Sequence, residues 1–136
     1  KVQLSSAIEV DFNEPHNPEI IKDLHSIAEP RYLHQTTISD GDQLLFEENL
    51  ADLPLDNPSG LWRVHFHVPI HLQQFGSLQT TQHDLKHSIP ILKHAGVTSW
   101  EVETYTWSVI PTALQQDELV DSIAKELTWA ATNINT

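Results

Sequence analysis

Alternation of apolar and polar side chains is the first pattern along this chain, and it predicts three β-strands. The alternation runs through Lys1–Ile8, Trp62–Val68 and Ser99–Trp107. A period of two residues is typical of a strand that buries one of its faces. Pro69 directly follows the second segment and has no N–H for further strand pairing. We therefore expect three strands, well separated along the sequence.

Three other segments repeat apolar residues at helical spacing. The first begins at Asn17-Pro18-Glu19, where Asn is a good N-cap and Pro suits the first turn, and Pro30 ends it. The second begins near Thr81 and ends at Gly96, a residue type that commonly terminates helices. The third spans Glu118–Ala131, and its spacing predicts an inward face made of Leu119, Val120, Ile123, Leu127 and Ala130.

A hairpin is the remaining predicted element. Tyr32–Ile38 and Gln43–Phe46 flank a short polar turn that contains Gly41. Outside this hairpin, strands and helices alternate, and that order favours parallel βαβ units with right-handed crossovers. We expect an α/β fold of about three βα units plus a hairpin, in a single domain over residues 1–136.

Composition narrows the possible partners and location. The chain has 136 residues with 19 acidic and 7 basic side chains, and its formal charge of −12 argues against binding nucleic acid. No apolar run approaches the roughly 20 residues of a membrane span, and the first residues do not resemble a signal peptide. The absence of cysteine fits a reducing compartment, so we expect a cytoplasmic protein. The absence of methionine suggests a piece of a longer chain.

The segment WRVHFHVPIHL carries the most concentrated candidate chemistry. Period two places His65 and His67 on one face of their strand, and Glu101 and Glu103 on one face of theirs. If the two strands are neighbours, these side chains could converge on a divalent ion such as Mn²⁺, Mg²⁺, Co²⁺ or Zn²⁺. The alternative is that one His pairs with one Glu in a polar interior and no ion binds.

Other motifs give weaker indications of a functional site. HDLKH, residues His83 to His87, has the His spacing of a zinc-protease helix, but Asp84 stands where that motif needs Glu, and we interpret it as a solvated helix face. The chain has no glycine-rich phosphate loop and no GxSxG nucleophile motif, and without cysteine it has no thiol nucleophile.

Four longer strings suggest a family. KVQLSSAI, EPRYLHQT, WRVHFHVPIH and WEVETYTWSVIP together resemble the C-terminal part of the EboE family of metabolite-traffic proteins. That family is similar to sugar phosphate isomerases and epimerases of the xylose-isomerase-like barrel class. The resemblance implies that this chain is the C-terminal portion of a (β/α)8 TIM barrel.

The resemblance also implies roles for individual residues. Barrels of that class bind a divalent ion through Glu, Asp, His and a second Glu, and His67 and Glu103 look like the last two of these, as metal ligands and catalytic groups. The other two ligands would precede this chain, so the metal site would be only partly supplied here. We expect substrate contacts from His65, His71, Glu101 and Tyr105.

Two functions follow as hypotheses from the resemblance. The first is a metal-dependent sugar isomerase or epimerase linked to bacterial metabolite traffic. The second is a non-catalytic binding or trafficking module that keeps the barrel. A free-standing small α/β protein is a third possibility. In each of the first two cases the expected partners are a sugar-like small molecule and either a second copy of the chain or the remainder of the barrel.

Overall fold

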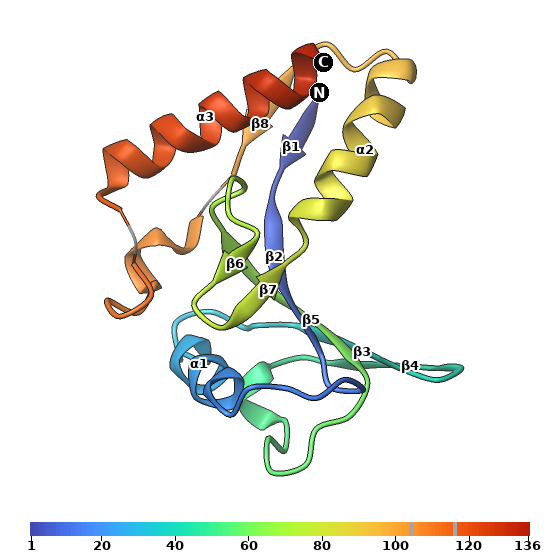
Figure 1. The fold of residues 1–136 in the computed structure, drawn as a ribbon, viewed down its shortest axis with the longest axis vertical. Helices are drawn as coiled ribbons and strands as arrows, with labels where there is room; N and C mark the ends of the chain where they lie inside the picture. Colours follow the sequence, from blue (N-terminus) through green and yellow to red (C-terminus); the bar gives the residue numbers. More distant parts are fainter. Residues whose placement is uncertain (104, 116) are drawn as a thin grey trace.

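The larger of two sheets in this protein is antiparallel throughout. A computed structural model describes residues 1–103, 105–115 and 117–136, and these residues form a six-stranded sheet, a two-stranded sheet and three α-helices. In the six-stranded sheet the strand order is β4-β3-β5-β2-β7-β6 (Figure 1). Its strands are β2 (Ser6–Asp11), β3 (Thr36–Asp40), β4 (Gln43–Glu47), β5 (Leu61–Val68), β6 (Gln74–Phe75) and β7 (Leu78–Thr80).

A smaller parallel sheet and two helices occupy the other end of the molecule. The strands β1 (Val2–Leu4) and β8 (Trp100–Val102) pair in parallel there. The helices α2 (Gln82–His94) and α3 (Leu119–Asn135) flank this pair, and both chain termini lie at the same end (Figure 1). The remaining elements are α1 (Glu19–Ile27) and the 3-10 turns η1 (Leu50–Asp52) and η2 (Tyr105–Val109).

Local signals placed several of these elements correctly. The side chain of Asn17 accepts a hydrogen bond from the N–H of Glu19, the first residue of α1, at 3.0 Å, while Pro18 occupies the cap position itself. Gly96, with φ of +85°, follows α2 directly after Ala95. Gly41 takes a φ of +58° in the turn that joins β3 to β4, and the predicted hairpin is confirmed.

The buried apolar residues form two clusters. The larger lies on one face of the six-stranded sheet, where alternate residues of β5 meet the buried side chains of α1, including Leu24 and Ile27. The smaller cluster joins β1 to the two flanking helices through Leu4, Ile70, Ile89 and Ala130. The opposite face of the six-stranded sheet carries more polar side chains, and the candidate site lies there.

The prediction of parallel βα units from a TIM barrel is wrong. The β2 and β5 strands pair antiparallel, with Glu9 opposite Arg63 and Val10 opposite Trp62. The segment predicted as one N-terminal strand is divided: its first part pairs with β8 in the small sheet, and its second part enters the large one. In addition, β6 and β7 form an antiparallel hairpin in a stretch without clear alternation, and β6 is the last strand of the open sheet.

The predicted inward face of α3 is also wrong in most positions. Ala130 is buried, but the large apolar residues Leu119, Val120, Ile123 and Leu127 are exposed. Ser122 and Glu126 are buried in their place. A specific contact accounts for this orientation, because the Glu126 carboxylate accepts a hydrogen bond from the buried N–H of Ile70 at 3.1 Å.

Candidate functional site

Two histidines of β5 meet on the polar face of the large sheet. Along this strand the side chains of Trp62, Val64 and Phe66 enter the larger apolar cluster. His65 and His67 point to the opposite face, as the period of two predicts, and their Nε2 atoms lie 3.0 Å apart. Their ring centroids are 4.9 Å apart with an interplanar angle of 45°. The two imidazoles are therefore hydrogen-bonded to each other, with one Nε2–H donating to the other Nε2.

The two histidines differ in burial, and this sets the charge of one of them. His67 is 6% exposed, whereas His65 is open to solvent. Burial, followed by the nearby His65, lowers the pKa of His67 from 6.5 to about 4. The nearby main chain of Glu103 acts in the opposite direction. The ring of His67 is therefore neutral at pH 7, the form in which imidazole binds metal ions.

The segment that follows β8 holds His67 in place. The N–H of Glu103 donates to the carbonyl of Leu4 at 3.0 Å, which continues the pairing of β8 with β1. Further along, the buried hydroxyl of Thr106 donates to the main-chain carbonyl of His67. This segment therefore fixes the backbone of His67, and the main chain of Glu103 lies near its ring.

The other predicted site residues lie in different places. Glu101 forms an ion pair with Lys1, with 2.9 Å between Nζ and Oε1, on the exposed side of β8. Tyr105 begins η2, and its side chain lies outside the described residues. The structure thus joins His65 to His67, brings the main chain of Glu103 to them, and places Glu101 against the terminus. Their roles in catalysis or substrate binding stay predictions.

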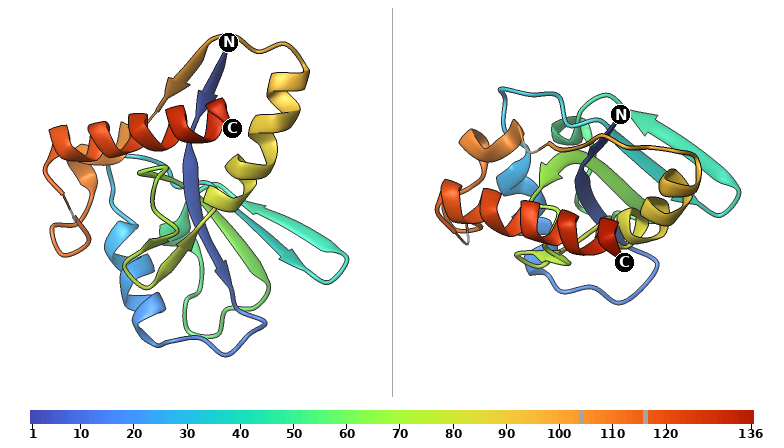
Figure 2. Two further views of the ribbon diagram at one scale, coloured as in Figure 1. Left: turned by 45° about the horizontal axis from the view of Figure 1, so that its top comes forward. Right: turned by 90° about the horizontal axis from the view of Figure 1, so that it is seen from above.

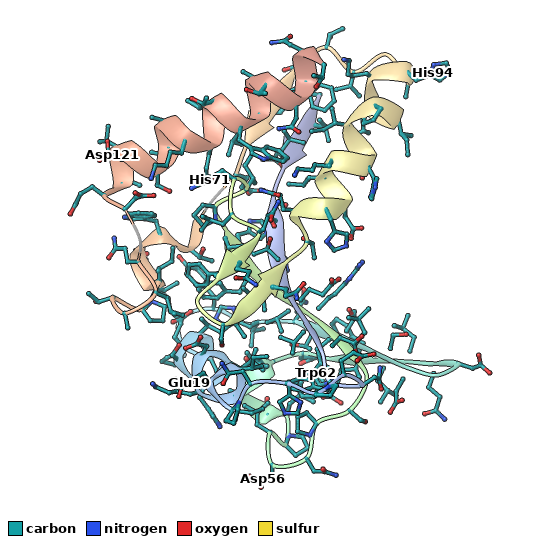
Figure 3. The ribbon with its side chains drawn as sticks, in the orientation of Figure 1. Glu19, Asp56, Trp62, His71, His94 and Asp121 are labelled. Atoms are coloured by element: carbon teal, nitrogen blue, oxygen red, sulfur yellow. The ribbon has the colours of Figure 1, made fainter. Side chains whose placement is uncertain are left out.

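His71 lies in an open surface hollow beside α3. Figure 3 shows it below this helix, with Asp121 at the helix start. Burial lowers the pKa of His71, and the nearby Glu126 carboxylate opposes that shift. Its Nδ1 is buried with no hydrogen-bond partner among the described residues. The hollow has a volume of about 580 Å³ and is lined by His71, Asp117, Asp121, Lys125, Thr128 and Trp129.

Sequence reasoning missed Glu126 because its burial depends on how α3 packs. Nothing in the helical pattern distinguishes this glutamate from the exposed acidic residues around it. Its carboxylate is 2% exposed and binds the loop that carries His71. The burial of Glu126 follows from its hydrogen bond to the N–H of Ile70. That contact can be seen only in the tertiary structure.

A charged cluster on α2 and β2 was also missed. Donor atoms of Glu9, His83 and Asp84 all lie within 4.8 Å of one another. Arg63 already occupies this cluster, since its guanidinium contacts Glu9 at 2.7 Å and Asp84 at 3.0 Å. The carboxylates therefore have a cation from the protein itself, and we interpret the cluster as an ion-pair network rather than a metal centre. His83 is half exposed in it, which agrees with the solvated helix face predicted for HDLKH.

Comparisons with known proteins do not assign this chain to a family. No family model, no curated protein and no solved structure matches the chain. The resemblance to the EboE family therefore stays a prediction. Within the described residues, the helices are too short or too polar to cross a membrane.

Proposed function

We propose that this protein is a binding module that holds a divalent transition-metal ion through His65 and His67. The observation that carries this proposal is the 3.0 Å hydrogen bond between their Nε2 atoms, whose shared proton a metal ion would replace. If each nitrogen lies about 2.0 to 2.1 Å from a shared ion, the angle at the ion is roughly 90 to 100°. That angle suits an octahedral ion and needs only a small ring rotation for a tetrahedral one. Imidazole ligands favour Zn²⁺, Co²⁺ and related ions over Mg²⁺.

The surroundings of the pair support the same proposal. The hydroxyl of Thr106 donates to the main-chain carbonyl of His67 and so fixes the backbone that carries this ring. Because the pKa of His67 is about 4, protons do not compete for it at neutral pH.

The pair leaves several coordination positions open. Two protein nitrogens cannot complete the four to six ligands that these ions take, so water or a small polar ligand would fill the rest. A ligand with adjacent oxygens, such as a sugar, fits that requirement. We therefore expect moderate rather than tight metal affinity. Separately, the lack of cysteine supports a cytoplasmic location for the protein.

Binding is a better-supported role than sugar isomerisation. The isomerase hypothesis needs four ligands at successive strand ends of a barrel, and the antiparallel sheet does not supply that arrangement. A binding or trafficking role needs only a site that captures and releases its ligand. The pair of imidazoles at the surface of the sheet is such a site.

Calorimetric titration of Zn²⁺ and Co²⁺ into protein without an affinity tag tests the proposal. We expect one site, and His65→Ala and His67→Ala should each weaken binding by at least about tenfold. His94→Ala is the matched control because His94 is exposed at the end of α2, where Figure 3 labels it, and it should bind like the wild type. Glu103→Ala keeps the main chain, so any loss in this variant reports on the carboxylate. Unchanged binding in both His65→Ala and His67→Ala would refute the proposal.

A further inference from the structure

The strand β4 is an open edge of the large sheet. It pairs with β3 on one side, and among the described residues no strand lies on its other side. Figure 1 and both views of Figure 2 show the β3–β4 hairpin extending away from the rest of the molecule. The outward N–H and C=O groups of an edge strand are free to pair with another strand.

The side chains of β4 are unusual for an open edge. Leu44, Leu45 and Phe46 are 75%, 50% and 56% exposed. Open edges are normally protected by lysine, proline, a bulge or a covering segment. The five residues of β4 include no lysine, arginine or proline, and their pairing with β3 runs without a register shift. This combination of an open backbone edge with apolar residues on both faces favours an added strand.

We propose that β4 pairs antiparallel with β4 of a second copy of this chain, across a two-fold axis at Leu45. In this register Leu45 lies opposite the partner's Leu45, and Leu44 lies opposite the partner's Phe46. Such a contact is self-complementary, as a two-fold interface must be. The two large sheets then become one continuous sheet.

Charge favours this register over the parallel alternative. The single charged residue of β4 is Glu47, and the antiparallel register places it opposite the partner's Gln43, which is neutral. A parallel, in-register pair would instead set each Glu47 beside the partner's Glu47, and like charges directly opposite destabilise a strand pair. Within the strand, QLLFE therefore matches its own reverse in apolar content, and one residue beyond each end this register sets Asp42 opposite the partner's Glu48.

The charge of the whole chain predicts how the dimer responds to salt. Each copy carries a formal charge of −12, so two copies repel one another at low ionic strength. Salt screens this repulsion over a distance of about 10 Å at 0.1 M. The contact is short and of the size class that gives weak association. We expect a monomer–dimer equilibrium that moves toward the dimer as protein and salt concentrations rise.

Sedimentation equilibrium in the presence of a chelator measures this association directly. Wild type should associate reversibly, and more strongly in high salt, while Leu45→Lys should stay monomeric because the two new lysines face each other at the axis. Ile91→Lys is the matched control, since Ile91 is 69% exposed on α2 and the charge change is the same, and it should associate like the wild type. Circular dichroism confirms that both variants are folded.

Three results would overturn the proposal. If the wild type is monomeric at every protein and salt concentration, the proposed dimer does not form. Association of Leu45→Lys equal to the wild type assigns the contact to another surface, such as the exposed apolar side of α3. Association that the chelator abolishes assigns it to bridging by metal, so this experiment is independent of the histidine site.

Discussion

At the scale of single residues, His34 shows how a polar side chain is held in the larger core. It is fully buried, its Nε2 lies 3.1 Å from a carboxylate oxygen of Glu29, and its ring lies 5.1 Å from that of Phe66. The same carboxylate accepts hydrogen bonds from the N–H groups of Arg31 and Tyr32. Glu29 therefore ties the loop after α1 to the sheet.

Removing this carboxylate should destabilise the protein. Glu29→Ala leaves a buried imidazole nitrogen and two main-chain N–H groups without their acceptor, and we expect a loss of about 1 to 3 kcal/mol in the free energy of unfolding. Urea unfolding followed by tryptophan fluorescence measures this change. Glu14→Ala, which removes an exposed carboxylate, should have almost no effect. Equal stability of the two variants would show that the Glu29 contacts contribute nothing.

The histidine pair makes stability depend on pH. His67 has a pKa of about 4 in the folded protein against 6.5 as its ordinary value, so between these values the unfolded state binds the extra proton. This contribution is absent above pH 6.5, and it lowers stability progressively as the pH falls toward 4, by at most about 1.4 kcal/mol per pH unit. His67→Gln cannot bind this proton.

Unfolding measured over that pH range, with a chelator present, separates this effect from other titrations. The wild type should lose stability more steeply than His67→Gln as the pH falls from 6.5 to about 4. Parallel curves for the two proteins would mean that His67 is readily protonated in the folded state. Only the difference in slope matters, since the substitution also changes stability at neutral pH.

At the level of elements, the ends of the helices could be predicted better than those of the strands. The strand predicted over Ser99–Trp107 is a strand only at Trp100–Val102, and a 3-10 turn occupies Tyr105–Val109. The hydrogen bond of Asn17, the glycine after α2 and the alternation in β5 are local signals, and they hold whatever lies nearby. The shared face of His65 and His67 follows from the same local geometry. The orientation of α3 could not be predicted in this way, because the buried contact of Glu126 with the N–H of Ile70 joins residues 56 positions apart.

The orientation of α3 has a consequence for stability. Leu127 is 56% exposed, so Leu127→Ala should change the free energy of unfolding by less than about 1 kcal/mol. Ile89→Ala on α2 removes a fully buried side chain of the smaller cluster and should cost about 2 to 5 kcal/mol. Urea unfolding of both variants tests the assignment. A large loss for Leu127→Ala would show that the apolar side of α3 is the packed one.

At the scale of the whole molecule, the barrel prediction failed because the order of elements along a chain does not fix how its strands pair. Strand, helix, strand describes a parallel crossover, but here the strands on either side of α1 and its loop lie in one antiparallel sheet. In the predicted metal site, the placement of the histidines did not depend on how the strands pair, but the placement of the carboxylates did. His65 and His67 belong to one strand, whereas Glu101 and Glu103 needed a particular neighbouring strand and a particular side of it.

Residue-resolved NMR of the histidine side chains measures directly whether His65 and His67 together bind a divalent metal ion. The chain has nine histidines, and ¹⁵N resonances of the imidazoles can be followed one by one as Zn²⁺ is added. We predict that the Nε2 resonances of His65 and His67 shift together and saturate together, while those of His83, His87 and His94 do not change. Shifts confined to His83, or spread over the exposed histidines with no change at His65 and His67, would contradict the claim.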